Sequence, residues 1–196
     1  MLSIFNRNKY VLEGISVSRG MLRQYSIFDY ETKAPIIEIE EKSDLVTGVL
    51  RMTMLGGVIP FSFRAYNPIG ELVFTLQKEA KFGKVSFIDV LNPEGDIIAQ
   101  FPRDLLFFSK PFEVWDTQRN PLFTIKPSFT GKTQFFTMDD QLMAELSRKA
   151  GGEFSWTNLL SGTSNSRMFI EIKDVVPPND ILRRIILATV IYLQIS

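Results

Sequence analysis

The feature that most constrains the fold of this chain is a hairpin signature that occurs five times along it. Each copy is a short run of alternating apolar and polar residues, a turn containing Asp, Asn, Gly or Pro, and a second such run. Alternation with period two is typical of a β-strand that buries one face. The five copies predict a mainly β protein. Their turns lie at residues 32–35, 67–70, 92–95, 116–120 and 139–140.

The second copy illustrates the physics of all five. Its first run, FSFRAY, places Phe61, Phe63 and Ala65 on the inner face and Ser62 and Arg64 on the outer face. The NPIG that follows suits a tight turn, because Pro fixes φ and Gly tolerates positive φ. A lone hairpin is marginally stable in water. We therefore expect the hairpins to join into a larger antiparallel sheet whose edges are closed or covered.

The last fifteen residues before the terminal serine have a different character. The run Ile181–Ile195 is apolar on nearly every side after its first turn, and Pro177–Asp180 precedes it as chain punctuation with an N-cap. A helix at about 180–195 that is apolar all round must be surrounded by protein. A fully buried strand is the competing interpretation, but strands rarely exceed ten residues. A helix of this length rises about 22 Å, which is short of the roughly 30 Å of bilayer hydrocarbon, so we predict a core element.

Antiparallel hairpins followed by one apolar C-terminal helix resemble the tubby C-terminal-like superfamily, and within it the phospholipid scramblase and LURP-one-related branch. The resemblance spans residues 25–196 and is carried by FRAYNPIGELVFTL, FIDVLNPEGDIIAQF, FEVWDTQRNPLFTI, FFTMDDQLMAELSRK, MFIEI and DILRRIILATVIYLQI. It implies a single domain over residues 1–196, a closed antiparallel barrel of about twelve strands around a central hydrophobic helix. The acidic segment that scramblases carry before the helix is reduced here to Glu171, Asp174 and Asp180, too few for a calcium cage.

Composition excludes several kinds of chemistry. The chain has no Cys and no His, which rules out disulfides, thiol nucleophiles, imidazole metal ligands and Ser-His-Asp triads. Lys and Arg together number 22, equal to Asp and Glu, so no global charge favours nucleic acid. The GKT at residues 131–133 lacks the rest of a phosphate-binding loop. We expect a non-enzymatic protein without a metal or cofactor. The N-terminus lacks a secretory signal, which favours a cytoplasmic location.

Two segments are candidate binding sites. Lys78, Lys81, Phe82 and Lys84 connect two hairpins and could dock on anionic lipid headgroups, with a solvated connector as the alternative. Residues 150–167 are rich in Gly, Ser, Thr and Asn, and their apolar side chains either pack over the barrel opening or bind a protein partner. These side chains are Phe154, Trp156, Leu159 and Leu160.

Two smaller features have structural interpretations. Arg183 and Arg184 are expected at the mouth of the barrel, paired with rim carboxylates or, as the alternative, binding an anion. Asp139 and Asp140 are expected to serve a turn through hydrogen bonds from side chain to backbone. The functional hypothesis is peripheral binding to an anionic phospholipid membrane, and a protein partner is the second candidate ligand. The alternative is a structural or protein-interaction module without a lipid role.

Overall fold

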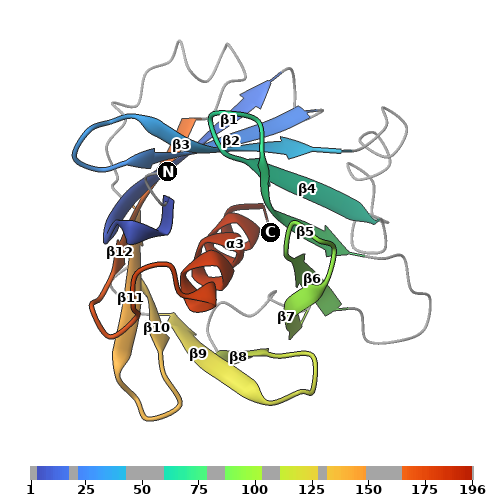
Figure 1. Ribbon diagram of the computed structural model, residues 1–196. Helices are drawn as coiled ribbons and strands as arrows, with labels where there is room; N and C mark the ends of the chain where they lie inside the picture. Colours follow the sequence, from blue (N-terminus) through green and yellow to red (C-terminus); the bar gives the residue numbers. More distant parts are fainter. Residues whose placement is uncertain are drawn as a thin grey trace.

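The computed structural model describes residues 4–17, 22–42, 60–78, 87–102, 111–127, 132–148 and 165–195. In this part of the chain, twelve antiparallel strands close into a barrel, and one helix runs through the middle (Figure 1). The elements are η1 (Ile4–Asn6), β1 (Lys9–Val17), β2 (Leu22–Asp29), β3 (Pro35–Glu41), β4 (Phe61–Tyr66), β5 (Leu72–Lys78), β6 (Phe87–Leu91), β7 (Ile97–Pro102), β8 (Phe112–Trp115), β9 (Pro121–Pro127), β10 (Lys132–Phe136), β11 (Leu142–Arg148), β12 (Asn165–Ile172) and α3 (Ile181–Ile195).

The barrel closes between its first and last strands. Each strand pairs with its neighbours in sequence, and β1 pairs with β12, for example through Tyr10 opposite Ile170. Because every strand of the closed barrel has a neighbour on both sides, the described sheet has no exposed edge. The strand Lys9–Val17 was not predicted from the sequence pattern, so the barrel begins earlier in the chain than the quoted hairpins. The predicted fold, a closed barrel of about twelve strands around the C-terminal helix, is confirmed.

All five predicted hairpins form, and four of them share one turn geometry. In the β4–β5 hairpin, the Gly70 N–H donates to the Asn67 carbonyl at 2.9 Å, and the Asn67 side-chain oxygen accepts from the Glu71 N–H at 2.8 Å. Each hairpin has a register shift just before its turn and one residue with positive φ at its end. In four hairpins this is a type I turn followed by a left-handed residue, as in many three-residue hairpin loops. The β2–β3 turn is one residue longer, and there the Lys33 N–H donates to the Asp29 carbonyl at 3.0 Å. The positive-φ residues are Lys33, Gly70, Gly95, Arg119 and Asp140.

The fifth turn differs in detail from its prediction. The side chain that accepts the backbone hydrogen bond is that of Thr137, from the Gln141 N–H at 3.0 Å, and neither aspartate is the acceptor. Asp140 instead adopts the left-handed conformation, with φ 59°. Its carboxylate accepts a hydrogen bond from Lys126 Nζ at 2.6 Å. Met138, predicted as the last residue of the preceding strand, lies in the turn.

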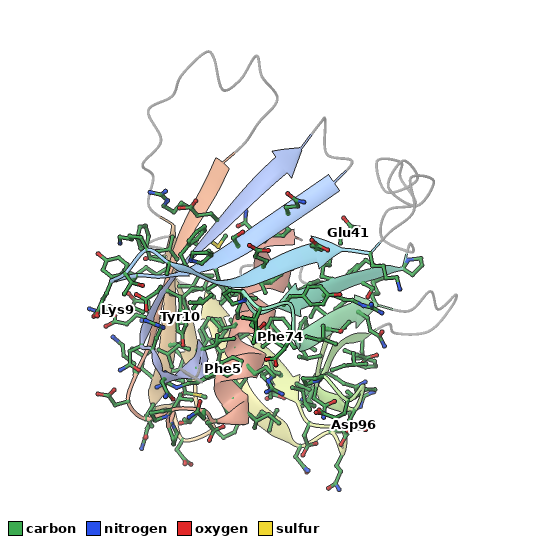
Figure 2. All side chains as sticks on the ribbon, turned by 45° about the horizontal axis from the view of Figure 1, so that its top comes forward. Phe5, Lys9, Tyr10, Glu41, Phe74 and Asp96 are labelled. Carbon is green, nitrogen blue, oxygen red and sulfur yellow. The ribbon has the colours of Figure 1, made fainter. Side chains whose placement is uncertain are left out.

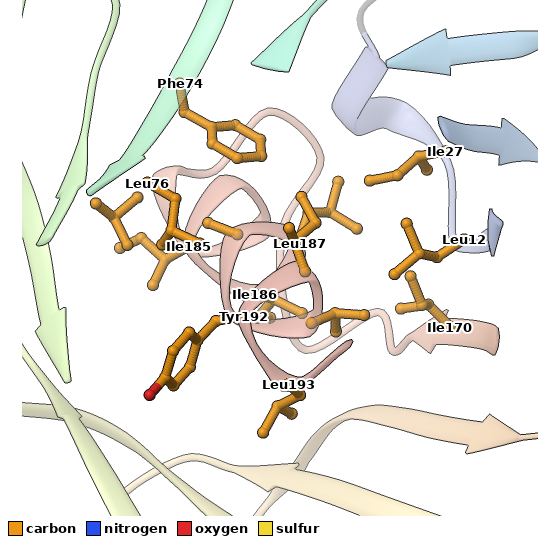
Figure 3. Packing of buried hydrophobic residues seen from close by; sticks show 14 of the residues in the cluster. Leu12, Ile27, Phe74, Leu76, Ile170, Ile185, Ile186, Leu187, Tyr192 and Leu193 are labelled. Atoms are coloured by element: carbon orange, nitrogen blue, oxygen red, sulfur yellow. The ribbon is translucent and has the colours of Figure 1, made fainter. Parts of the chain in front are cut away.

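The helix α3 fills the barrel. It begins at Ile181, where the Asp180 side chain accepts a hydrogen bond from the Leu182 N–H at 2.8 Å, so the predicted N-cap is confirmed. Its side chains from Ile185 to Leu193 are buried. Figure 3 shows them pointing out from α3 toward inward-facing residues of the strands, including Leu12, Ile27 and Phe74. The prediction of a surrounded helix is therefore confirmed, and the buried-strand alternative is wrong.

The inner face of β4 follows the predicted alternation. Phe63 and Ala65 are buried, and Phe61 packs against the same core while remaining partly exposed. Ser62 and Arg64, on the opposite face, are also partly exposed.

Candidate functional site

The two ends of the barrel differ in how the strands are connected. At one end lie the five tight turns, the linker 173–180 between β12 and α3, residues 4–8 and the first residues of α3; we call this the turn end. The strands' other termini lie at the opposite end, which we call the loop end. In Figure 2, Asp96 marks the turn end, because it is the last residue of the β6–β7 turn. Glu41 marks the loop end, because β3 ends there.

The turn end is strongly acidic. Its five turns, at residues 29–34, 67–71, 92–96, 116–120 and 137–141, and the linker 173–180 contain ten Asp and Glu residues but only three Lys and Arg residues. Several of these carboxylates are engaged within the fold; for example, Asp174 accepts a hydrogen bond from Asn8 Nδ2 at 2.7 Å. Those of Glu31, Glu94 and Asp139 make no hydrogen bond or ion pair with another described residue. The turn end thus presents an excess of negative charge to solvent.

The turn end also exposes apolar side chains. All six large hydrophobic residues that are exposed in the described ranges lie there, in three turns, at the first residue of β7, in the linker and at the start of α3. Ile69, at the tip of the β4–β5 turn, is the most exposed at 73%. Gathering of exposed apolar side chains at one end is typical of an interaction surface. The six are Tyr30, Ile69, Ile97, Met138, Val175 and Ile181.

Beneath this surface, Arg183 closes the barrel around the start of the helix. Its side chain is 1% exposed and makes no ion pair with a described carboxylate. Its Nε donates to the carbonyls of Val176 and Pro177 at 3.1 and 2.9 Å, and Nη2 donates to Val176 again at 2.7 Å. The remaining bonds reach the N-terminal segment, through Nη1 to the Arg7 carbonyl and Nη2 to Asn8 Oδ1. For Arg183 the preferred prediction, pairing with rim carboxylates, is wrong, because carbonyl oxygens surround the guanidinium.

Two further buried groups complete this cluster. Asp29 is 3% exposed and forms an ion pair with Arg7. The Tyr10 hydroxyl donates to the Arg7 carbonyl at 2.7 Å. Burial raises the pKa of the Tyr10 hydroxyl above its ordinary value, although the positive charge of Arg183 acts in the opposite direction. The cluster therefore joins residues 4–10, the linker and α3 in one hydrogen-bonded unit.

Arg184 occupies a different environment from its neighbour. It is partly buried, and its guanidinium carbon lies 5.4 Å from the centre of the Phe5 ring. Desolvation lowers the pKa of Arg184, partly offset by the negative charge of Glu94. Its Nε atom is buried and has no hydrogen-bond partner in the described part of the chain. The charge of Glu94, a rim carboxylate, therefore acts on Arg184.

A shallow hollow of about 210 Å³ lies on the outer wall over β11, β12 and β1. Tyr30 and Phe169 meet edge to face on it, with ring centres 5.9 Å apart. Glu145 and Glu171, paired across β11 and β12, also line it, as does Lys9. Hydrogen bonds from Lys132 to Glu145 at 2.7 Å hold the pKa of that carboxyl below its usual range, and Lys173 pairs with Glu171 at 2.8 Å. Since lysines already balance both carboxylates, the hollow does not favour a ligand of either charge.

The predicted lipid-binding residues are only partly described. Lys78 is the last residue of β5 and is 6% exposed, with its Nζ 5.9 Å from the centre of the Phe61 ring. Lys81, Phe82 and Lys84 lie outside the described residues, so the headgroup site as a whole stays a prediction. Residues 150–164 of the predicted partner loop, with Phe154, Trp156, Leu159 and Leu160, also lie outside them. The prediction was wrong for residues 165–167, which form the start of β12.

The described residues contain neither a candidate metal site nor a helix that could cross a membrane. No group of three or more His, Cys, Asp or Glu side chains in these ranges could hold a metal ion. Of the three carboxylates weighed for calcium, Glu171 pairs with Lys173 and Asp180 caps α3. No helix in the described ranges combines the length and the apolar character needed to cross a bilayer.

Comparison with known proteins identifies the fold and little beyond it. No protein-family model matches the chain, and no curated protein matches it. Among solved structures, it is similar to the X-ray structure of a protein from Arabidopsis thaliana. The match has a TM-score of 0.51 and 13% sequence identity, and covers 97% of this chain and 94% of the other. Because the identity is so low, this likeness shows a shared barrel architecture only.

Proposed function

We propose that this chain is a non-enzymatic binding module of the tubby-like, scramblase-related kind that associates peripherally with anionic phospholipid membranes at the cytoplasmic face. The observation that carries the proposal is the unequal distribution of charge along the barrel axis. The turn end has ten acidic residues against six basic ones, and three of those six, Arg7, Arg183 and Arg184, are buried or partly buried. An anionic membrane would repel that end, so the loop end is the membrane-facing one.

The sequence of the segments that join the strands at the loop end supports this orientation. These segments, 18–21, 43–59, 79–86, 103–110, 128–131 and 149–164, lie outside the described residues. Together they contain seven Lys and Arg residues against four Asp and Glu residues. They also contain Phe82, Phe107, Phe108, Phe154 and Trp156. Cationic residues interspersed with aromatic ones favour a membrane surface, where each lysine contributes about 1 kcal/mol.

The interior of the barrel supports binding over catalysis. Residues of α3 from Ile185 to Leu193 occupy the space that a substrate would need, and they pack against apolar residues of the wall. The polar cluster at the start of α3 is hydrogen-bonded internally, with Arg183 fully engaged. A rigid, filled barrel of this kind supports contacts at its ends.

The experiment is co-sedimentation of the whole protein with vesicles of phosphatidylcholine alone or with added phosphatidylserine. We expect binding to the anionic vesicles at low salt and its loss at high salt. Neutralising Lys81 and Lys84 to Gln should weaken partitioning about 30-fold, because two lysines near the surface contribute about 2 kcal/mol.

The matched control removes the same charge from the opposite end. Lys33→Gln with Lys173→Gln lowers the net charge equally, at one exposed and one partly exposed position of the turn end. This pair should leave vesicle binding unchanged or slightly weaker. Absence of binding to anionic vesicles at low salt would rule out the lipid role and favour the alternative, a structural or protein-interaction module. Equal effects of the two pairs would refute the proposed orientation.

A further inference from the structure

We infer that the turn end is a docking surface for a protein partner, and that the partner presents a cationic, amphipathic segment to it. This inference concerns the end of the barrel opposite the proposed membrane contact and does not depend on that contact. Two independent properties of the described residues carry it: the exposed apolar side chains gather there, and so does the excess of carboxylates.

The apolar component surrounds the start of the central helix. Ile181 is half-exposed where α3 begins, and Val175 lies in the linker before it. The other exposed members of the set come from three turns spaced around the barrel rim and from the first residue of β7, and Ile69 is the most exposed of them at 73%. Each covers little area alone. A partner that touches several of them at once removes enough apolar surface from water to bind.

The electrostatic component decides the charge of the partner. Glu31, Glu94 and Asp139 are exposed, and none is paired with another described residue. Of the three basic residues of the turns and linker, Lys33 lies over the Tyr30 ring, and Lys173 pairs with Glu171. The third, Arg119, lies 3.8 Å from the centre of the Phe87 ring. The cations are thus engaged while carboxylates remain available, so the surface is complementary to lysine and arginine side chains.

The turn end is also held in one shape before binding. Three backbone or side-chain hydrogen bonds at 2.8–2.9 Å join Asp116 to Asn120, and the Asn92–Asp96 turn repeats the arrangement. The linker and the N-terminal segment are tied to α3 through Arg183. A preorganised surface loses little conformational entropy on association.

A membrane is the other occupant that exposed apolar side chains can suggest. Ten acidic residues disfavour the anionic lipids that attract peripheral proteins. The same negative charges favour a basic protein segment, so the net charge of the turn end predicts a cationic partner.

The test uses two synthetic amphipathic helices about 18 residues long, one of leucine and lysine and the other of leucine and glutamate. The whole protein is titrated with each peptide, and backbone amide shifts are followed by NMR. We expect saturable binding of the lysine peptide only, with the shifts concentrated in the turns, the linker and the start of α3. Glu94→Gln with Asp139→Asn should weaken binding about three- to tenfold. Ile69→Ser should weaken it at least threefold.

The control variant is Glu38→Gln with Glu40→Gln, which changes net charge equally at two exposed positions on the wall of β3. The inference is overturned if this variant weakens binding as much as the turn-end pair, if shifts spread over the wall, or if the peptide does not saturate. It is also overturned if uncharged phosphatidylcholine vesicles bind and Ile69→Ser abolishes that binding, because the occupant would then be a membrane. Lys81→Gln with Lys84→Gln should leave peptide binding intact. Failure of the lipid proposal can therefore be distinguished from failure of this inference.

Discussion

The carbonyl oxygen of Val176 accepts two hydrogen bonds from one guanidinium, from Nε of Arg183 at 3.1 Å and from Nη2 at 2.7 Å. Val176 lies in the linker before α3, and Arg183 lies in the first turn of the helix itself. The same guanidinium reaches back to the carbonyl of Arg7. One side chain therefore fixes where the helix enters the barrel and where the N-terminal segment crosses it.

Replacing Arg183 with Met should destabilise the fold strongly. The substitution removes five hydrogen bonds, which contribute about 0.5–1.5 kcal/mol each, and leaves the buried carbonyl of Val176 without these donors. We expect a loss of at least about 3 kcal/mol in the free energy of unfolding, measured with guanidinium chloride. Arg183→Lys should retain only a small part of the stability that Arg183→Met loses, because one ammonium cannot replace a planar group with five donors.

Arg184→Met is the matched control for this prediction. Arg184 is the next residue, with the same side chain, but its Nε has no partner in the described part of the chain and its pKa is lowered by burial. We expect its loss to cost less than about 1 kcal/mol. Equal destabilisation by the two substitutions would refute the role assigned to Arg183.

These two arginines also show what the sequence could and could not predict. Period-two alternation predicted most of the strands, because burial of one face of a strand leaves a local pattern in the sequence. The apolar run after Asp180 predicted the buried helix in the same way, because burial on all sides requires apolar residues on all sides. The environment of Arg183 depends on carbonyls of residues 7, 176 and 177, and backbone oxygens carry no sequence signal. Pairing with carboxylates was therefore the natural but wrong expectation.

The turn end illustrates the same limit at the level of a surface. The turns were predicted from Asn, Asp, Pro and Gly, and Asn67 and Asp116 accept the expected hydrogen bonds. That all five turns share one end with the linker follows from the antiparallel order of the strands, in which every second connection lies at the same end. The solvent exposure of the individual apolar and acidic side chains at that end depends on packing, which leaves no local sequence pattern.

The Tyr10 hydroxyl should make stability fall above pH 10. Burial raises its pKa in the folded protein above the ordinary value of 10.0, so the unfolded chain loses this proton first as the pH rises. Where the unfolded state binds fewer protons, the free energy of unfolding decreases with pH, by up to about 1.4 kcal/mol per pH unit for one group. Urea denaturation between pH 9 and about pH 11 measures the slope.

Tyr10→Phe should reduce that slope while lowering stability at neutral pH. The variant keeps the buried ring but loses the hydrogen bond to the Arg7 carbonyl, a cost of about 1 kcal/mol. A slope unchanged in the variant would assign the alkaline transition to other groups.

The carboxyl of Asp116 should titrate below its ordinary value. Hydrogen bonds from the Asn120 side chain and from backbone N–H groups lower the pKa of Asp116 from 3.8. Because these bonds favour the ionised form, their stabilising contribution is present above pH 3.8 and is lost as the pH falls through the lower, folded pKa. Carboxyl chemical shifts followed by NMR across the acid range measure the value directly.

Asn120→Ala should move the pKa of Asp116 back toward 3.8. The variant removes the Nδ2 donor, 2.9 Å from Asp116 Oδ2, and keeps the backbone N–H at that position. Gln118→Ala is the control, because Gln118 contributes its backbone N–H alone. A larger shift in the Gln118 variant would contradict this account of the turn.

Leu187→Ala should reveal how tightly the barrel holds its helix. Leu187 is fully buried among inward-facing residues of the wall, as Figure 3 shows. Truncating a buried leucine costs about 2–5 kcal/mol, through lost transfer energy and the cavity left behind. Ile181→Ala, at the exposed start of the same helix, should cost less than about 1 kcal/mol. Comparable losses at the two positions would mean that α3 is not packed as described.

Gly70 should be replaceable by Asn at a smaller cost than by Ala. Its φ of 83° is one that residues with a Cβ rarely adopt, whereas a Cβ built there meets no atom within 4 Å. The penalty is therefore conformational, about 1–2 kcal/mol for Ala, and Asn tolerates the left-handed region better than Ala does. Thermal unfolding of Gly70→Ala and Gly70→Asn measures the difference. If both variants unfolded at the same temperature, the shared turn geometry would not explain why Gly occupies this position.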